Sequence, residues 1–340
     1  MLSWLRPLFA RTPARPPADV LLETLRAELA PGAPWETARA RRCAAALNEL
    51  TASHIDTFRE HLPGLREQFA AWYVAHPFEV VWSRDYDFRV VDPLRLTTDD
   101  AIGGADTPLL RPWATLLRSF EIVVGGAHAF HHGCDLEDLL RVLRDPSLPR
   151  RIERFALPRM DNYLPRQIDD LVALMVNEPC FAELRHLAIK TALPLEPRHL
   201  EQLAAAPWAG ALRTLDLCET MVDWSVDLPD EQRHRALRAL QRFTGLTHLF
   251  LYNDIGPTGD LAVLLEAPFA ELTHLSLGHG TKDAAVLELV ATTRSLPSLQ
   301  EFCFDGGPAR TDPAWDRALA ASFSVYLHGT RVTAEYPKRA

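Results

Sequence analysis

The sequence predicts an α/β solenoid in which short parallel strands alternate with helices. Three observations lead to this fold class. A six-residue phrase, Leu-x-x-Leu-x-Leu, recurs along the chain, and its copies begin 26 to 35 residues apart. The stretches between the copies carry helical periodicity, and several of them end at a proline just before the next copy. A fixed phrase with a period of about 20 to 50 residues is typical of solenoid proteins.

The phrase itself predicts the strands. Its strict copies begin at Leu184, Leu212, Leu246 and Leu272, and its looser copies begin at Val91, Leu117, Ile152 and Leu299. We expect positions 1, 4 and 6 of each copy to face the core, and positions 3, 5 and 7 to include the outward side chains, because a strand alternates its faces. Strands this short must pair with their neighbours, and a parallel pair needs a long crossover between its strands.

Helices are expected in these crossovers. The predicted ranges are 135–145, 166–177, 197–206, 230–243, 259–266 and 282–295, and a further helix is expected at 314–321 before a last strand at 322–327. Prolines follow several of the helices, at 146, 179, 207, 268 and 297. Proline lacks a backbone N–H and disfavours helical backbone in the residue before it, so these positions are expected to end the helices.

The repeats occupy the middle of a four-part chain. The predicted parts are a flexible tail at 1–18, a helical N-terminal cap at 19–76, the solenoid at 77–307, and a C-terminal cap and tail at 308–340. Helices in the cap cover the apolar end of the first coil, with a break or kink expected at Pro63 and Gly64. Strands are expected at 78–82 and 87–91. The tail carries three arginines, so a membrane or partner anchor is the alternative to a frayed end.

One repeat carries a family signature after its strand. The stretch from Leu246 ends its strand at Asn253 and continues with Ile255, Gly256 and Gly259 before the next helix. This order resembles a leucine-rich repeat of the ribonuclease-inhibitor-like class, in which an asparagine ends the strand and an aliphatic residue and glycines lead into the helix. The resemblance covers roughly residues 90–307, although Thr191, Glu219, His279 and Gly306 replace the asparagine in other copies. It implies a curved array with parallel strands on the concave side and helices on the convex side, which binds proteins along the concave face.

Composition limits the other functional classes. The chain has 340 residues, of which 47% are hydrophobic, and this is ample for a large core. A net charge of −9 disfavours binding to nucleic acid. The five cysteines are scattered without a Cys-x-x-Cys pair, which fits reduced thiols in a cytoplasmic protein. No apolar run approaches the ~18 residues of a membrane span. The abundance of alanine, arginine and proline suggests a bacterial source.

The candidate binding residues are outward positions of the predicted strands. They are His186, Lys190, Asp216, His248, Phe250, Tyr252, His274 and Asp305. Exposed aromatic side chains with polar neighbours are typical of interface hot spots, and the alternative for Phe250 is that a loop or neighbouring side chain covers it. No nucleophile elbow, phosphate-binding glycine loop or His-Glu-x-x-His motif is found. We therefore expect a non-enzymatic scaffold that binds a protein partner, with no cofactor.

A metal site is the main alternative. The segment His128–Cys134 holds three histidines and one cysteine, and imidazole and thiolate are good zinc ligands. Its spacing matches no zinc finger, but such a site would make the chain a metal-binding protein or a metal-dependent enzyme. His248 and His274 occupy the third positions of adjacent copies, so together with Cys218 or Glu301 they are a second metal candidate. A third alternative places the activity in the N-terminal helices and leaves the repeats to target them.

Overall fold

A computed structural model gives the structure of the chain. It describes residues 15–32, 37–82, 88–91, 115–121, 151–160, 165–191, 195–217, 229–251, 258–277, 284–304, 313–321, 323–327 and 330–332. Backbone contacts divide the chain into two compact units. Three N-terminal helices belong to the first unit, and the strands and helices from residue 117 onward belong to the second. Because each unit has its own core, we describe them separately. The four domain boundaries expected from the sequence remain predictions.

The first unit consists of the helices α1 (Ala18–Glu28), α2 (Thr37–Ser53) and α3 (Ile55–Ala75). Helix α1 packs on α2, and α2 packs on α3. Their buried side chains include Leu25 of α1, Leu47 and Leu50 of α2, and Phe69 and Trp72 of α3. Helices of this length are marginal in isolation, so this packing of apolar faces is the main source of their stability.

Of the break or kink expected at Pro63 and Gly64, the break is wrong, because α3 continues through both residues. A proline inside a helix removes one hydrogen bond and costs about 3 kcal/mol. Phe58 before the proline and Leu65 and Phe69 after it are all buried. Each buried side chain of this kind contributes about 1.5–3 kcal/mol, so packing on both sides of Pro63 offsets the local cost.

Two short strands follow the helices. The strands β1 (Glu79–Trp82) and β2 (Phe88–Val91) form a two-stranded sheet, which confirms the strands expected in this stretch. Val91 is the first residue of the looser phrase at 91–96, and it ends β2 instead of entering the large sheet. The rest of that phrase lies outside the described residues.

The second unit is built on an open sheet, which in the described part of the chain has nine strands in the order β11-β10-β9-β8-β7-β6-β5-β4-β3. Their bounds are β3 Ser119–Glu121, β4 Arg154–Met160, β5 His186–Thr191, β6 Thr214–Asp216, β7 His248–Leu251, β8 His274–Leu277, β9 Glu301–Phe304, β10 Ser324–Leu327 and β11 Thr330–Val332. Strands β3 to β10 pair in parallel, and β11 pairs antiparallel with β10. The α/β class and the parallel strand order are therefore confirmed, whereas β11 was not expected.

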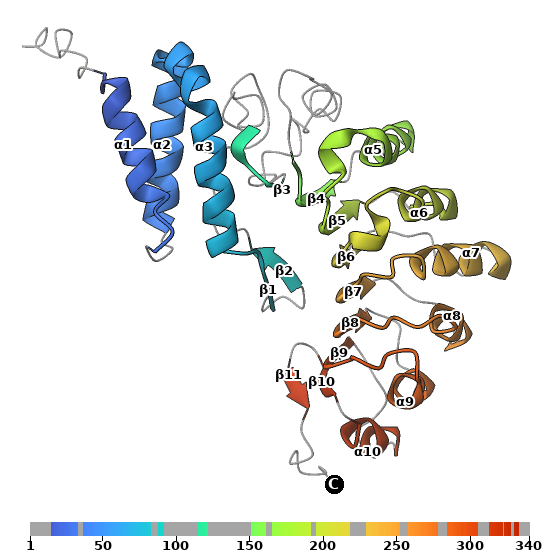
Figure 1. Ribbon diagram of the computed structural model, residues 1–340. Helices are drawn as coiled ribbons and strands as arrows, with labels where there is room; N and C mark the ends of the chain where they lie inside the picture. The colour runs from blue at the N-terminus through green and yellow to red at the C-terminus, as the bar shows by residue number, and fades with distance from the viewer. Residues whose placement is uncertain are drawn as a thin grey trace, which may run out of the picture. The chain divides into compact units, whose positions relative to one another are not determined.

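Helices connect the strands along one side of the sheet, as Figure 1 shows. They are α5 Pro165–Asn177, α6 Pro197–Ala204, α7 Asp230–Leu240, α8 Thr258–Leu264, α9 Ala284–Thr292 and α10 Ala314–Leu319. Each of these helices packs on the next one. Proline stands at the first position or the N-cap of α5, α6, α7 and α10, where its missing N–H costs nothing. The helix expected at 135–145 lies outside the described residues.

The leucine phrases form the core between the strands and these helices. In the four strict copies, positions 1, 4 and 6 are all at most 1% exposed. These residues are Leu184, Leu187 and Ile189; Leu212, Leu215 and Leu217; Leu246, Leu249 and Leu251; and Leu272, Leu275 and Leu277. The fourth positions are paired strand to strand without offset, from Leu187 through Leu215, Leu249 and Leu275 to Phe302. The expected core positions are thus confirmed.

Backbone hydrogen bonds fix this register at the start of strands β4 to β9. The carbonyl of Arg213 accepts from the N–H groups of Thr247 at 2.8 Å and His248 at 3.0 Å. The carbonyl of Thr247 accepts in the same way from Thr273 and His274. Just upstream, Gly245 lies so close to the preceding level that a Cβ atom would stand 2.4 Å from the Gly210 carbonyl oxygen. Only glycine fits such an approach, so the second and third positions are held tightly against the preceding strand.

Candidate partner-binding face of the sheet

The third positions of the phrases form a polar row across the sheet. Register pairs Arg154 with His186, His186 with Thr214, Thr214 with His248, His248 with His274, and His274 with Glu301. We call these six residues the third-position row. Their side chains point away from the helices, because the neighbouring fourth positions point toward the helices. Adjacent strands lie about 4.8 Å apart, so neighbouring side chains in the row are in contact distance.

Threonine hydroxyls orient two of the histidines. The Thr247 hydroxyl donates its only proton to the Arg213 carbonyl at 3.0 Å and lies 2.8 Å from His248 Nδ1. The Thr273 hydroxyl donates to the Thr247 carbonyl at 2.9 Å and lies 2.8 Å from His274 Nδ1. Because each hydroxyl proton is already used, each Nδ1 must be the donor. The neutral forms of His248 and His274 therefore carry the proton on Nδ1, and Nε2 is an acceptor.

The two oriented rings stack on each other. The His248 and His274 centroids are 4.2 Å apart, and their planes differ by 10°. Burial, followed by the neighbouring His274 and His186, lowers the pKa of His248 to about 3. Burial, followed by Arg154 and Arg185, lowers the pKa of His186 to about 4. Burial also lowers the pKa of His274, although Glu301 acts in the opposite direction. At neutral pH the centre of the row is therefore uncharged.

Glu301 is the acidic member of the row. Its Oε2 atom lies 3.5 Å from His274 Nε2, and the two side chains are 25% and 19% exposed. This distance is too long for a good hydrogen bond, which has a donor–acceptor distance of about 2.7–3.2 Å for N–H···O. Sequence reasoning did not include Glu301 among the binding residues, because its importance depends on His274 in the preceding repeat.

Most of the described fifth positions on the same face are buried, although Ala188 is half-buried. Phe250 is 0% exposed and Asp216 is 5% exposed, and Ala156, Ser276 and Cys303 are buried as well. The expectation that Phe250 and Asp216 present exposed side chains is therefore wrong, and the alternative that Phe250 is covered is confirmed. Strand alternation gives the direction of a side chain, but it does not show whether other parts of the molecule cover that face.

The remaining candidates are placed as follows. His186, His248 and His274 are half-buried and belong to the third-position row. Lys190 lies on β5, and Tyr252 and Asp305 lie outside the described residues. The structure thus brings together three of the eight candidate residues and adds Arg154, Thr214 and Glu301. Whether these side chains bind a partner remains a prediction.

No set of metal ligands is found among the described residues. Within the ranges that the structure describes, no three histidine, cysteine, aspartate or glutamate side chains are grouped to hold a metal ion. His248, His274 and Glu301 accordingly do not form one. Cys218 and the His128–Cys134 segment lie outside those ranges.

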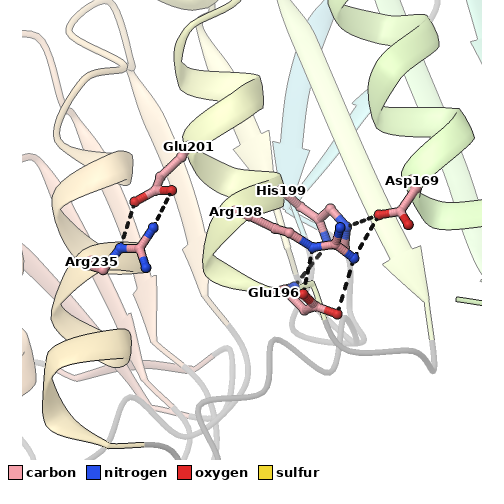
Figure 2. A network of polar contacts seen from close by, with 6 residues as sticks. All are labelled: Asp169, Glu196, Arg198, His199, Glu201 and Arg235. Carbon is pink, nitrogen blue, oxygen red and sulfur yellow. Dashed lines mark hydrogen bonds and ion pairs between the residues drawn. The ribbon is translucent and has the colours of Figure 1, made fainter. Parts of the chain in front are cut away.

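An aspartate–histidine pair lies on the helical side, and Figure 2 shows it among its neighbours. The His199 Nε2 atom is 2.7 Å from Asp169 Oδ1, an arrangement that often orients a catalytic base. However, the backbone N–H of Glu196 donates to His199 Nδ1 at 3.0 Å. Both ring nitrogens are thus used within the chain, and His199 caps the start of α6. The hydrogen bond from His199, reinforced by Arg198, holds the pKa of Asp169 below its ordinary value.

Ion pairs join the successive helices on that side. Arg198 of α6 pairs with Asp169 of α5 at 2.9 Å, and Arg235 of α7 pairs with Glu201 of α6 at 2.8 Å (Figure 2). Arg233 of α7 pairs with Asp260 of α8 at 3.0 Å, and both side chains are buried. These side chains take part in ion pairs between neighbouring repeats, so they stabilise the packing of one helix on the next. Sequence reasoning missed Asp260, since periodicity gives no signal for a buried ion pair.

No family model and no curated protein matches this chain. In the part of the chain that the structure describes, no helix combines the length and the apolar character that crossing a membrane requires.

Proposed function

We propose that the chain is a leucine-rich-repeat-type solenoid that binds a protein partner through the strand face opposite the helices. The third-position row is the centre of this surface. The protein acts as a non-enzymatic scaffold in the cytoplasm, and the partner approaches along the concave side that such an array has. The proposal rests on this chain's own repeats and side-chain placement.

The observation that supports the proposal best is the row itself. Arg154, His186, His248, His274 and Glu301 occur at equal positions on adjacent strands, and hydroxyl and backbone contacts fix the two central rings. Rigid side chains lose little entropy on binding, which favours recognition. Eight parallel strands at ~4.8 Å spacing extend over about 34 Å, a width that suits a protein better than a small metabolite.

A capture experiment with matched variants tests this surface. The first variant, His248→Ala/His274→Ala/Glu301→Ala, removes three half-buried side chains from one end of the row. The control variant, Glu201→Ala/Arg235→Ala/Arg317→Ala, removes the same number of side chains from the helical side, where Arg235 and Arg317 are 51% and 48% exposed. Both variants must first match the wild type in circular dichroism and in cooperative unfolding.

We expect a protein that is captured by the wild type and by the control variant but lost with the row variant. When binding to the purified partner is measured, the row variant should bind at least about tenfold more weakly than the wild type, because hot-spot truncations cost roughly 2 kcal/mol or more. Equal capture by both variants would show that the partner uses another surface. Loss with the control variant alone would place the binding surface on the helices.

A further inference from the structure

The stacked rings of His248 and His274 can hold one added proton more easily than two. Their centroids are 4.2 Å apart and their planes differ by 10°, so the rings lie face to face. Both side chains are half-buried, so water and salt screen charges in the stack less than they do at an open surface. Two imidazolium groups at this distance repel each other strongly. Protonation of one ring consequently opposes protonation of the other.

The position of Glu301 favours His274 as the ring that takes the proton. In each neutral ring the Nδ1 proton is donated to a threonine hydroxyl, so an added proton binds at Nε2. His274 Nε2 lies 3.5 Å from Glu301 Oε2, and a proton there places the positive charge next to the carboxylate. The contact can then shorten toward the ~2.7–2.9 Å of a charge-assisted hydrogen bond. Because the Nδ1 proton is kept, the ring does not need to turn.

The charged groups around the stack lead to the same order of protonation. In the described part of the chain they are Arg154 on β4, Arg185 and His186 at β5, Asp216 on β6, Glu301 and Cys303 on β9, and the ion pair of Arg213 and Glu271 at the strand starts. Asp216 is the acidic group on the His248 side of the stack. Nevertheless burial, followed by His274 and His186, lowers the pKa of His248 to about 3. Burial lowers the pKa of His274 as well, but there Glu301 acts in the opposite direction.

We propose that the His248–His274 stack and Glu301 form an acid-sensitive switch that takes up one proton, at His274, while His248 stays neutral. The proton comes from the solvent and binds the Nε2 lone pair, and no other covalent bond forms or breaks. Before uptake, His274 and Glu301 together carry the negative charge of the carboxylate, and after uptake the positive ring compensates it. The strand face thereby changes its charge at β8 and β9 as the pH falls. This inference goes beyond the proposed function, because it concerns a property of the chain alone.

Histidine NMR on the full chain tests the switch. With nitrogen-15 in the histidine rings, spectra recorded from pH 7.5 to pH 5 show which ring nitrogens carry protons. We expect His274 to gain its Nε2 proton below pH 6.5, and His248 to keep a neutral ring with its proton on Nδ1. Glu301→Gln should lower the pKa of His274 by about one, a tenfold weaker affinity for the proton, because it removes the adjacent negative charge. Glu301→Asp, which keeps the charge, should restore part of this loss.

Glu288→Gln is the matched control, because that carboxylate lies on α9, is 48% exposed and should leave the titration unchanged. The variants His248→Gln and His274→Gln assign the two ring signals, and amide spectra at each pH verify that the protein stays folded. A first proton on His248, simultaneous uptake by both rings, or an unchanged His274 titration in Glu301→Gln would overturn the switch. The titration needs no partner, so the switch and the proposed function can fail separately.

Discussion

On the helix side of the sheet, the fourth positions of the central strands are leucine or phenylalanine, and all of them are buried. On the other side, the third positions of the same strands are arginine, histidine, threonine and glutamate, and the fifth positions include Phe250 and Asp216. Both sides share one backbone and one register. They differ in that the helix side repeats a single kind of side chain, whereas the other side changes its chemistry from strand to strand.

The comparison separates the side chains that stabilise the fold from those that differ between neighbouring repeats. Leucine at the fourth position meets the same requirement in every repeat, which is to fill the space under a helix. The third position has no such uniform requirement, so it can carry a polar side chain wherever a neighbour supplies a contact, as Thr247 does for His248. The fifth position is an intermediate case, because its side chains face away from the helices and most of the described ones are nevertheless buried.

The largest expected effect comes from the fifth position. Phe250→Ala should lower the free energy of unfolding by about 3–5 kcal/mol, because it empties the space of a fully buried ring. Leu249→Ala on the helix side should cost a similar ~2–5 kcal/mol. Chemical denaturation followed by tryptophan fluorescence measures both, with Val74→Ala, at an 80%-exposed position, as the control that should change little. A cost below about 1 kcal/mol for Phe250→Ala would show that the two faces are packed differently after all.

Acid should lower the free energy of unfolding through the histidines on the polar side of the sheet. The folded-state pKa values of His186, about 4, and His248, about 3, lie below the ordinary value of 6.5. The unfolded chain therefore binds more protons than the folded chain below pH 6.5, and stability falls as the pH drops toward these folded-state values. Between pH 6.5 and 5, each histidine should remove about 2 kcal/mol from the free energy of unfolding.

Urea denaturation at several pH values checks this, with the His186→Gln/His248→Gln variant as the comparison. The variant keeps polar side chains in the row and cannot titrate at these two positions. Its stability should vary less than that of the wild type between pH 6.5 and 5. Parallel pH profiles for the two proteins would contradict the assignment of the acid sensitivity to these rings.

The smallest expected effect concerns the hydroxyl that orients the row. Thr247→Val keeps the side-chain shape but removes the bond to the Arg213 carbonyl and the acceptor for His248 Nδ1. Loss of this bridge should lower the free energy of unfolding by about 1 kcal/mol. Thr292→Val is the matched control, because that hydroxyl bonds only within α9, to the Glu288 carbonyl, and is exposed. Nitrogen-15 NMR of His248 should also show a changed tautomer in Thr247→Val, and an unchanged spectrum would contradict the tautomer assigned here.

The sequence predicted the helix side of the sheet well. The phrase from Leu184 to Leu277 located the core residues, since a period of two within strands and a helical period between them are both local signals. The prediction failed where contacts between residues far apart in the sequence, and not local patterns, determine the structure. The helix α3 continues through Pro63 because Phe58 and Leu65 are buried on either side, and β11, with three residues, is too short to give a pattern.

The candidate face was predicted only in part, for the same physical reason. Alternation along a strand shows that His248 and Phe250 point to the same side, but it cannot show that Phe250 is buried while His248 remains partly accessible. The contact between His274 and Glu301 joins residues from two repeats, and its distance depends on strand register. Sequence spacing suggested that they are neighbours, but only the structure gives the 3.5 Å distance between His274 Nε2 and Glu301 Oε2.

The hydrogen bonds from the start of each of the strands β4 to β9 to a carbonyl of the preceding repeat have a consequence for how such a protein can evolve. Second-position carbonyls such as those of Arg213 and Thr247 bond to the next strand, and each helix packs on its neighbours in the array. A substitution at one third position therefore disturbs the adjacent levels and leaves the more distant ones intact. Descendants of this chain can exchange His274 or Glu301 for other residues one level at a time, and so change the chemistry of this face while the leucine core is inherited unchanged.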